Sequence, residues 1–380
     1  MNILLVNWQD PENPHAGGAE LHLFELFSRL VSRGHQVHLV SSGWPGGAST
    51  ASIRGISVER HGGRHTFATL GRAAFRRALG REQWDIVVED INKLPLYLAS
   101  MTSLPFCAII PHLFGTTAFQ EAWWPMAAVV AIAEQPIPRL YRRAGFHAIS
   151  ESTRDDLVAR GVARERVRVI HPGIDAGSYH PGSGLDRTEL PTFLYVGRLK
   201  RYKGVEVAIR ALALARRERP ELTLDIAGTG DDAARLAQIA RELGQGSQVR
   251  FPGFVSEERK RELFRSAWAN LFPSPKEGWG LTVMEAAACG TPSLASDSPG
   301  LRDSVRHGET GFLVPHGDAA ALAKGMLQLA GDPALVDRLG AAARRHALSW
   351  SWDDAAAATE VHLTELVAGR GPLPPRSGRA

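Results

Sequence analysis

Two glutamates in a glycine-rich segment are well suited to bind a ligand that carries many hydroxyl groups. The segment Pro275 to Ala286 follows an apolar run and begins a helical pattern. Glu277 lies in the expected loop, and Glu285 lies about one turn into the expected helix. Each carboxylate oxygen accepts charge-assisted hydrogen bonds, which suits sugar hydroxyls. Both side chains can face one ligand, although two glutamates taken alone could be surface acids that favour a helix start.

The residues between these glutamates offer contacts to an anion. Gly278 and Gly280 carry no side chain, so the backbone can approach a ligand closely. The free backbone N–H groups of Leu281 and Thr282 form an anion site at the start of the helix. The segment therefore predicts a diphosphate that lies between two hydroxyl-binding carboxylates.

Cations for such a diphosphate occur in a second loop. The segment Val196 to Gly204 also follows a strand pattern and precedes a helix pattern, and it contains Arg198 and Lys203. Both side chains can converge on a leaving diphosphate and stabilise the charge that develops there. Solvated loop charges are the alternative interpretation.

The elements that must position these residues form two similar arrays. The chain opens with a short strand at residues 3–6, a helix at 19–32 that ends before Gly34, and a strand at 36–40, which predicts a βαβ unit and a parallel sheet. After a polar, Pro- and Gly-rich stretch at 180–191, the alternation begins again with a strand at 193–196 and a helix at 205–217. We therefore expect an α/β fold with two Rossmann-like, doubly wound domains that face a central cleft. The further expected strands cover residues 86–88, 106–110, 148–150, 167–170, 222–227, 249–251, 269–272, 293–295 and 312–314.

Length and composition fit this organisation. The chain has 380 residues, enough for two domains of typical size. Its net charge of +4 is too small for a nucleic-acid-binding stripe, so we expect no nucleic acid partner. Cys107 and Cys289 both lie in apolar runs, and neither a signal peptide nor a membrane-spanning segment is evident. These features predict a cytoplasmic protein.

The Glu277–Glu285 spacing resembles the signature of retaining glycosyltransferases with the GT-B fold, and the wider set of motifs resembles family 4 of those enzymes. The motifs span nearly the whole chain in the family's order. They are Gly17-Gly18-Ala19-Glu20, Ile149-Ser150-Glu151-Ser152-Thr153, Val169-Ile170-His171-Pro172-Gly173-Ile174-Asp175, Val196-Gly197-Arg198, Ile226-Ala227-Gly228-Thr229-Gly230, Gly253-Phe254-Val255 and the stretch from Pro299-Gly300-Leu301 to Thr310-Gly311.

This resemblance implies a role for each matching residue. Glu285 would bind the ribose hydroxyls, Glu277 would bind a hydroxyl of the donor sugar, and Arg198 and Lys203 would hold the diphosphate. His112 matches the family's histidine near the reacting carbon, although a structural histidine is the alternative. The catalytic set is Glu277, Arg198, Lys203 and His112. The donor-binding set is Glu285, Gly17, Gly18, Gly228, Phe254, Gly278, Trp279, Gly280, Leu281 and Thr282.

Some of these positions need a comment. The family most often has Phe where Trp279 stands. Gly18 would bring its backbone N–H to the phosphates from the other domain, although Gly17-Gly18 could be only a flexible turn. The nucleotide base would rest against the backbone around Phe254.

The resemblance also implies a domain plan and an activity. Residues 1–185 would bind the acceptor, residues 186–350 would bind the nucleotide sugar, 351–368 would form a helix that returns to the first domain, and 369–380 would form a flexible tail. The enzyme would transfer a hexose, with retention, from a UDP- or GDP-linked donor to a sugar or lipid-linked acceptor in glycan biosynthesis. No metal and no cofactor are expected. The alternatives are a sugar phosphorylase, a nucleotide-sugar epimerase and a non-catalytic nucleotide-sugar-binding module.

Two further features have competing interpretations. The segment 228–233 formally matches a dinucleotide fingerprint, but Asp231 and Asp232 at the helix start would repel a pyrophosphate, so we interpret it as a strand-to-helix turn near the donor. The basic stretches at 61–81 and 137–143, the latter near Trp123 and Trp124, could contact an anionic membrane face. A solvated helix face is the favoured interpretation of both.

Overall fold

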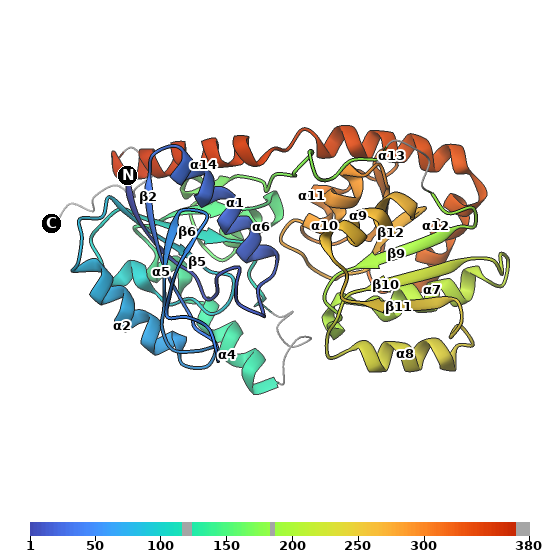
Figure 1. Cartoon of the computed structure of the whole chain (residues 1–380), viewed down its shortest axis with the longest axis horizontal. Coiled ribbons are helices and arrows are strands. Elements are labelled where there is room, and N and C mark those ends of the chain that lie inside the picture. Colours follow the sequence, from blue (N-terminus) through green and yellow to red (C-terminus); the bar gives the residue numbers. More distant parts are fainter. Residues whose placement is uncertain (116–123, 183–186, 370–380) are drawn as a thin grey trace. The chain divides into compact units, whose positions relative to one another are not determined.

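The computed structural model describes residues 1–115, 124–182 and 187–369, and these residues form two compact units (Figure 1). The described part of the first unit comprises residues 1–115, 124–173 and 352–369. The second comprises the described residues between Ile174 and Ser351. The second unit thus begins at Ile174, whereas the family resemblance implied a boundary after residue 185. The expected linker at 180–191 lies partly outside the described residues, and the expected tail lies outside them from residue 370.

The described residues of the first unit form an eight-stranded sheet in the order β3-β4-β2-β1-β5-β6-β7-β8. All neighbouring strands are parallel except the antiparallel pair β3–β4. The elements are β1 (Asn2–Val6), α1 (Gly18–Ser32), β2 (Gln36–Ser41), β3 (Thr50–Ile53), β4 (Ile56–Arg60), α2 (Phe67–Leu79), β5 (Ile86–Asp90), β6 (Phe106–Ile110), α4 (Trp124–Glu134), α5 (Ile137–Leu140), β7 (Gly145–Ala148), α6 (Glu151–Ala159), β8 (Val167–Val169) and α14 (Trp352–Val367).

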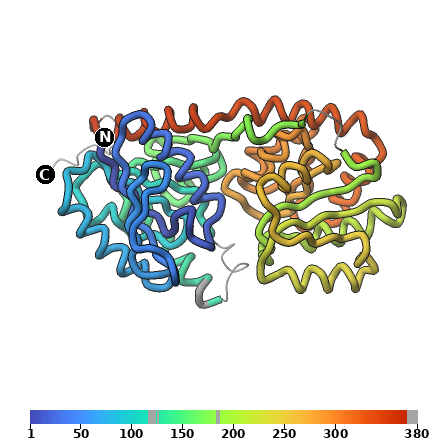
Figure 2. Tube along the Cα trace, viewed as in Figure 1, coloured from blue at the N-terminus to red at the C-terminus, as the bar shows by residue number. Residues whose placement is uncertain are grey.

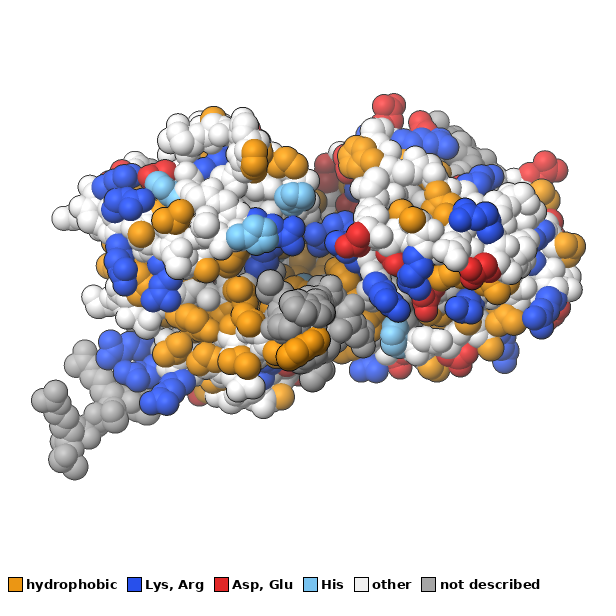
Figure 3. All heavy atoms as spheres, turned by 90° about the horizontal axis from the view of Figure 1, so that it is seen from below, with side chains coloured by type: hydrophobic (Ala, Val, Ile, Leu, Met, Phe, Trp, Pro, Cys, Tyr) orange, Lys and Arg blue, Asp and Glu red, His pale blue; other side chains and the backbone are white. Residues whose placement is uncertain are grey.

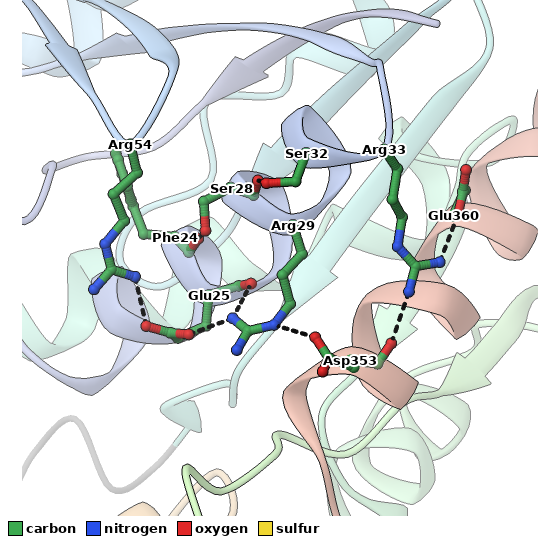
Figure 4. A network of polar contacts seen from close by, with 9 residues as sticks. All are labelled: Phe24, Glu25, Ser28, Arg29, Ser32, Arg33, Arg54, Asp353 and Glu360. Atoms are coloured by element: carbon green, nitrogen blue, oxygen red, sulfur yellow. Dashed lines mark hydrogen bonds and ion pairs between the residues drawn. The ribbon is translucent and has the colours of Figure 1, made fainter. Parts of the chain in front are cut away.

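The last helix of the chain packs in the first unit. Figures 1 and 2 show α14, in red, beside α1, in blue, and the two helices are in contact. Two ion pairs link α14 to the end of α1 and the residue after it (Figure 4): Arg29 Nε lies 2.7 Å from Asp353, and the Arg33 side chain lies 2.9 Å from Glu360. His35 Nε2 lies 2.7 Å from the same Glu360 carboxylate. Most of these side chains are partly exposed, so the ion pairs add little stability and chiefly fix the register of the two helices.

Beneath these ion pairs, α1, β7 and α14 bury three histidines. The ring of His22 lies 5.7 Å from that of His147 and 5.9 Å from that of Trp352. Burial is the main cause that lowers the pKa of His22 to about 3, of His147 to about 4 and of His362 to about 3, and charge repulsion between neighbouring imidazoles adds to it. These rings are therefore neutral wherever the unit is folded.

This cluster predicts that the first unit loses stability in mild acid. An unfolded histidine binds a proton as the pH falls below about 6.5, and the buried ring does not, so stability is full above that pH and is lost as the pH falls toward the lowered value. We expect each ring to contribute a loss of about 1 kcal/mol between pH 6.5 and 5.5. In urea unfolding, the free energy of unfolding of His22→Leu should fall less between pH 6.5 and 5.5 than that of the wild type.

The exposed His65 supplies the control for this measurement. His65→Leu should keep the wild-type difference between the two pH values. A His22→Leu chain that loses as much stability in acid as the wild type would show that the cluster does not take part.

The described residues of the second unit form a six-stranded parallel sheet in the order β11-β10-β9-β12-β13-β14. Helix α7 contacts α8 and α12, and helix α10 contacts α9 and α13 (Figure 1). The elements are β9 (Thr192–Val196), α7 (Val205–Ala215), β10 (Thr223–Ala227), α8 (Ala233–Glu242), β11 (Val249–Gly253), α9 (Glu257–Ser266), β12 (Ala269–Phe272), α10 (Leu281–Ala288), β13 (Ser293–Ser296), α11 (Leu301–Ser304), β14 (Gly311–Val314), α12 (Ala319–Gly331) and α13 (Pro333–Ala347).

The predicted α/β class with two parallel sheets is confirmed. The central strands are buried on both faces, so they appear in the sequence as short continuous apolar runs, and the alternation with helices predicts parallel pairing. The strands β3 and β4 were not predicted, because their residues alternate in burial at the sheet edge and form no apolar run.

Candidate functional site

The loops that carry the predicted chemistry meet at one edge of the second sheet. Strands β9 and β12 are hydrogen-bonded parallel neighbours, with Ala269 beside Phe193 and Asn270 beside Leu194. Their carboxyl ends therefore lie at the same edge, and the loops of residues 197–204 and 273–280 follow from there.

Lys203 and Glu277 join these two loops. The Lys203 Nζ donates a hydrogen bond of 2.6 Å to Glu277 Oε1, and the two side chains are only 12% and 14% exposed. The Lys203 ammonium also lies 4.9 Å from the centre of the Tyr202 ring. Burial on its own would lower the pKa of Lys203, but the Glu277 carboxylate outweighs it and raises this pKa above its usual value. Lys203 is thus a permanent cation held beside a carboxylate.

The loop after β13 fixes the position of Glu277. The backbone N–H of Glu277 donates to the carbonyl of Pro299 at 3.0 Å. Gly300 follows, with φ +80°, and a Cβ atom at this position would lie 2.1 Å from the carbonyl oxygen of Glu277. A side chain at residue 300 would therefore displace the backbone that carries Glu277.

This close approach predicts that Gly300→Ala impairs the site. Gly308 is a matched control, because it has a similar φ of +78° but a Cβ atom there would have no neighbour within 4 Å. Both variants place an alanine at a positive φ, which costs about 1 kcal/mol or more, whereas only Gly300→Ala moves Glu277. We expect Gly300→Ala to lower the affinity for a nucleotide sugar about tenfold or more, as measured by titration calorimetry, and Gly308→Ala to leave it near the wild-type value. Equal affinities of the two variants would contradict this role of Gly300.

Glu285 has its own set of partners. It is 7% exposed, accepts a hydrogen bond of 3.0 Å from the Tyr179 hydroxyl, and lies 3.1 Å from the ammonium of Lys260. The same hydroxyl and ammonium also contact Glu257. Burial raises the pKa of Glu285, and Lys260 opposes this effect. Tyr179 and Lys260 therefore orient a carboxylate that the sequence pattern identified without them.

Little in the sequence pointed to these two partners of Glu285. Tyr179 lies 106 positions from Glu285, and Lys260 occupies α9, whose charged composition looks like an ordinary solvent-facing helix. Burial and then Glu285 and Glu257 raise the pKa of Tyr179, so its hydroxyl stays protonated and serves as a hydrogen-bond donor to these carboxylates.

Arg198 lies in the same loop as Lys203 but is not joined to the glutamates. Its side chain is exposed and makes no hydrogen bond or ion pair with other described residues. Its carbonyl accepts a hydrogen bond of 3.1 Å from the Tyr195 hydroxyl. Burial raises the pKa of Tyr195, and the charges of Lys203 and Arg198 both lower it, so both cations lie near that hydroxyl.

The helix start that was predicted to bind an anion is present. Helix α10 begins at Leu281 after Gly280, which has φ +89°, and Leu281 and Thr282 are half-buried. The first N–H groups of a helix have no partner within it. The Trp279 side chain is buried against Trp350, with ring centres 5.5 Å apart, so only its backbone is placed to meet a ligand.

The glycine-rich segment after β10 packs against the Arg198 loop. A Cβ atom on Gly228 would lie 1.9 Å from the carbonyl oxygen of Gly197, and the Gly228 N–H donates to the Gly253 carbonyl at 2.8 Å. Asp232 pairs with Arg235. This geometry fits a strand-to-helix turn. Nearby, Phe254 is 81% exposed and is available to a ligand.

The predicted residues of the first unit lie at the carboxyl edge of their own sheet. Gly17 precedes α1 and its N–H donates to Glu20 at 2.7 Å, while Gly18 is the first residue of the helix. His112 follows β6 and its ring lies 4.7 Å from that of Phe114. The carboxylate of Glu134, which the sequence pattern did not reveal, accepts the N–H groups of Phe114 and Gly115 and so holds this loop.

Comparison with known families covers most of the chain. The family described as "Glycosyl transferases group 1" matches residues 181–346, and "Glycosyltransferase Family 4" matches residues 16–178. Glycogen synthase of Mycobacterium tuberculosis is 30% identical over 98% of this chain and 97% of its own length. The chain belongs to glycosyltransferase family 4.

Other members of the family are similar over a shorter span. The D-inositol 3-phosphate glycosyltransferase of Streptomyces avermitilis is 36% identical over 67% of this chain, and the match spans 58% of that protein's length. That of Streptomyces scabiei is 39% identical over 53% of this chain and 49% of its own.

Solved structures confirm the GT-B fold of this family 4 member. Sucrose-phosphate synthase from Thermosynechococcus elongatus has a TM-score of 0.84 at 22% identity, over 97% of this chain and 99% of that one. Anabaena HepE, solved in complex with UDP-glucose, has a TM-score of 0.78 at 20% identity, over 96% of this chain and 100% of its own. Among the described helices, none is both long and apolar enough to cross a bilayer.

Proposed function

We propose that this family 4 protein is a retaining glycosyltransferase that transfers a hexose from a UDP- or GDP-linked donor to an acceptor hydroxyl without a metal ion. The observation that carries the proposal is the 2.6 Å contact between Lys203 and Glu277 at the carboxyl edge of the second sheet. It puts a cation for phosphate and a carboxylate for sugar hydroxyls side by side, next to the start of α10. The relative solved with UDP-glucose supports a nucleotide sugar as the donor.

In this proposal each group of the second unit has one task. Lys203 and Arg198 neutralise the diphosphate as it leaves, together with the N–H groups at the start of α10. Glu277 binds a hydroxyl of the sugar, and Glu285, oriented by Tyr179 and Lys260, binds the ribose. The base rests against the backbone around the exposed Phe254. His112 of the first unit keeps the role near the reacting carbon that the family resemblance implies, and the departing diphosphate takes the proton of the acceptor hydroxyl.

The activity is tested with a panel of UDP- and GDP-hexoses in the presence of a chelator. We expect one donor to stabilise the protein thermally and to be hydrolysed slowly without an acceptor. Glycan breakdown that needs orthophosphate would identify a phosphorylase instead, and conversion of the donor sugar alone would identify an epimerase. Tight binding with no hydrolysis of any donor would identify a binding module.

Lys203→Ala separates turnover from donor binding. If Lys203 acts on the leaving diphosphate, its removal should lower kcat by about 100-fold or more and change the donor Kd much less. Steady-state kinetics and calorimetric titration measure the two effects.

Lys200 supplies a matched control for that variant, because it lies in the same loop but pairs with Asp231 at 2.7 Å and is 42% exposed. Lys200→Ala should keep the wild-type kcat and the wild-type Kd for the donor. Since Lys203→Ala also leaves Glu277 without its partner, Lys203→Arg serves as a charge-preserving variant that should recover part of the turnover. Equal losses in kcat and in donor affinity would reject the leaving-group role.

We also propose that the first unit contacts an anionic membrane face through α4 and α5. Trp124, Val129 and Ile132 are 68%, 51% and 64% exposed, and the nearby Arg139, Arg142 and Arg143 are exposed as well. Figure 3 shows hydrophobic and basic side chains together on this unit. Apolar side chains beside arginines suit a lipid surface. Helix α2 is a weaker candidate, because its Phe67 and Phe75 are buried in the core.

Sedimentation with vesicles of phosphatidylglycerol tests this surface. The double variant Val129→Ser, Ile132→Ser should bind such vesicles about tenfold more weakly than the wild type. Val361 on α14 is similarly exposed, at 50%, so Val361→Ser is the control and should bind like the wild type. Equal binding of the double variant and the control would exclude this surface.

A further inference from the structure

Asp90 is a buried carboxyl group for which the described residues provide no hydrogen-bond partner. It is the last residue of β5 and is 1% exposed. Neither of its carboxyl oxygens has a hydrogen-bond partner in the described part of the chain. A polar group buried in this way destabilises a fold, so native structures keep such groups rarely and mostly where function requires them.

Glu89, the preceding residue of β5, is a buried carboxyl group that does have hydrogen-bond partners. Glu89 is 2% exposed, and its oxygens accept the N–H groups of Leu96 and Leu98 at 2.7 and 3.2 Å and the Tyr141 hydroxyl at 2.9 Å. Successive side chains of a strand point to opposite faces, so these donors are on the side away from Asp90. Glu89 and Asp90 are thus similarly buried, but only the carboxylate of Glu89 has hydrogen-bond partners among the described residues.

Other polar side chains gather around Asp90. The Asn92 amide donates to Glu20 Oε1 at 3.0 Å, and the Lys93 ammonium lies 3.9 Å from the same oxygen and donates to Gln9. The Asn92 side-chain oxygen is buried and, like Asp90, has no partner among the described residues. Asp90 at the end of β5 and Asn92 in the loop that follows therefore both carry buried oxygens without a partner among the described residues.

The electrostatics favour a neutral carboxyl group at Asp90. Burial raises the pKa of Asp90 well above its usual value, the carboxylates of Glu20 and Glu89 raise it further, and Lys93 opposes them. A protonated carboxyl group can donate one hydrogen bond and accept another, which matches the two roles of an alcohol hydroxyl.

The position of Asp90 fits a ligand site. Strand β5 lies between β1 and β6, and Asp90 pairs with Ile109 near the end of β6. The loop with Asn92, the start of α1 and the loop with His112 all follow this carboxyl edge, where open α/β sheets bind their ligands.

We propose that Asp90 and the side-chain oxygen of Asn92 bind hydroxyl groups of a sugar or polyol. That this ligand is the acceptor rests on the proposed transferase function, whereas the binding of hydroxyls by Asp90 does not. Asp90 then acts as a specificity-determining residue of the first unit.

The first test compares the stability of two nearly isosteric variants. Asp90→Leu removes unpaired oxygens, so its melting temperature should equal or exceed that of the wild type, whereas Glu89→Met removes three hydrogen bonds and should melt lower. Asp90→Asn is the second variant if Asp90→Leu does not fold. A loss of stability in both Asp90 variants as large as that in Glu89→Met would show that Asp90 is structural and would overturn the proposal.

The second test measures the binding of methyl α-D-glucoside by saturation-transfer NMR, at a temperature where all variants are folded. We expect the wild type and Glu89→Met to bind the glucoside and the Asp90 variant to bind it about tenfold more weakly. Equal binding by the Asp90 variant, or no binding by the wild type, would overturn the proposal. Hydrolysis of the nucleotide sugar by the same proteins is measured in parallel. Its absence from the wild type would reject the transferase function and leave hydroxyl binding by Asp90 to be judged on its own result.

Discussion

The contact between Lys203 and Glu277 is the interaction on which the arrangement of the second unit depends. Each residue belongs to a loop that follows a different strand, and the loops meet because β9 and β12 are parallel neighbours. Partly buried opposite charges are tolerated when they are paired. Loss of one partner leaves the other charge unpaired in a partly buried position, which destabilises the fold. The close contact of Gly300 with Glu277 and the left-handed Gly280 then fix the loop that leads into α10. A lysine held in this way is charged and positioned before any phosphate arrives, which is the condition for electrostatic stabilisation of a leaving group.

The sequence predicted the residues of this site whose spacing is local. Glu277, Gly280 and Glu285 lie within one segment, and Lys203 follows its strand in the same manner, so the order of strand, loop and helix was enough to place them. The sequence did not reveal Tyr179, Lys260 and Glu134, because their partners are distant in the sequence. Tyr179 lies 106 positions from Glu285, and Glu134 accepts N–H groups from a loop about twenty residues before it. No pattern in a single sequence marks such pairs.

The same reasoning explains which parts of the fold were predictable. Strands that are buried on both faces form apolar runs, and their alternation with helices leaves parallel pairing as the simplest arrangement. The hairpin of β3 and β4 lies at an edge of the sheet, where burial alternates along each strand and no continuous apolar run forms. The aromatic residues Phe67 and Phe75 of the basic stretch at α2 lie in the core, so they are not available to a lipid surface.

The described residues of the first unit include a histidine cluster and Asp90 among their buried polar groups that lack hydrogen-bond partners, and the location of these groups separates a structural cause from a functional one. The ring of His22 on α1 packs against the rings of His147 on β7 and Trp352 on α14, and the charge of His147 acts on the buried His362 of α14. Neutral imidazoles can be buried there at a modest cost, since they replace apolar side chains in a helix contact. Asp90 has no such packing role, and it lies at the carboxyl edge beside other unused polar atoms. An apolar residue at position 90 would avoid the energetic cost of burying an unpaired carboxyl group. The presence of Asp90 is therefore best explained by a ligand that completes its hydrogen bonds.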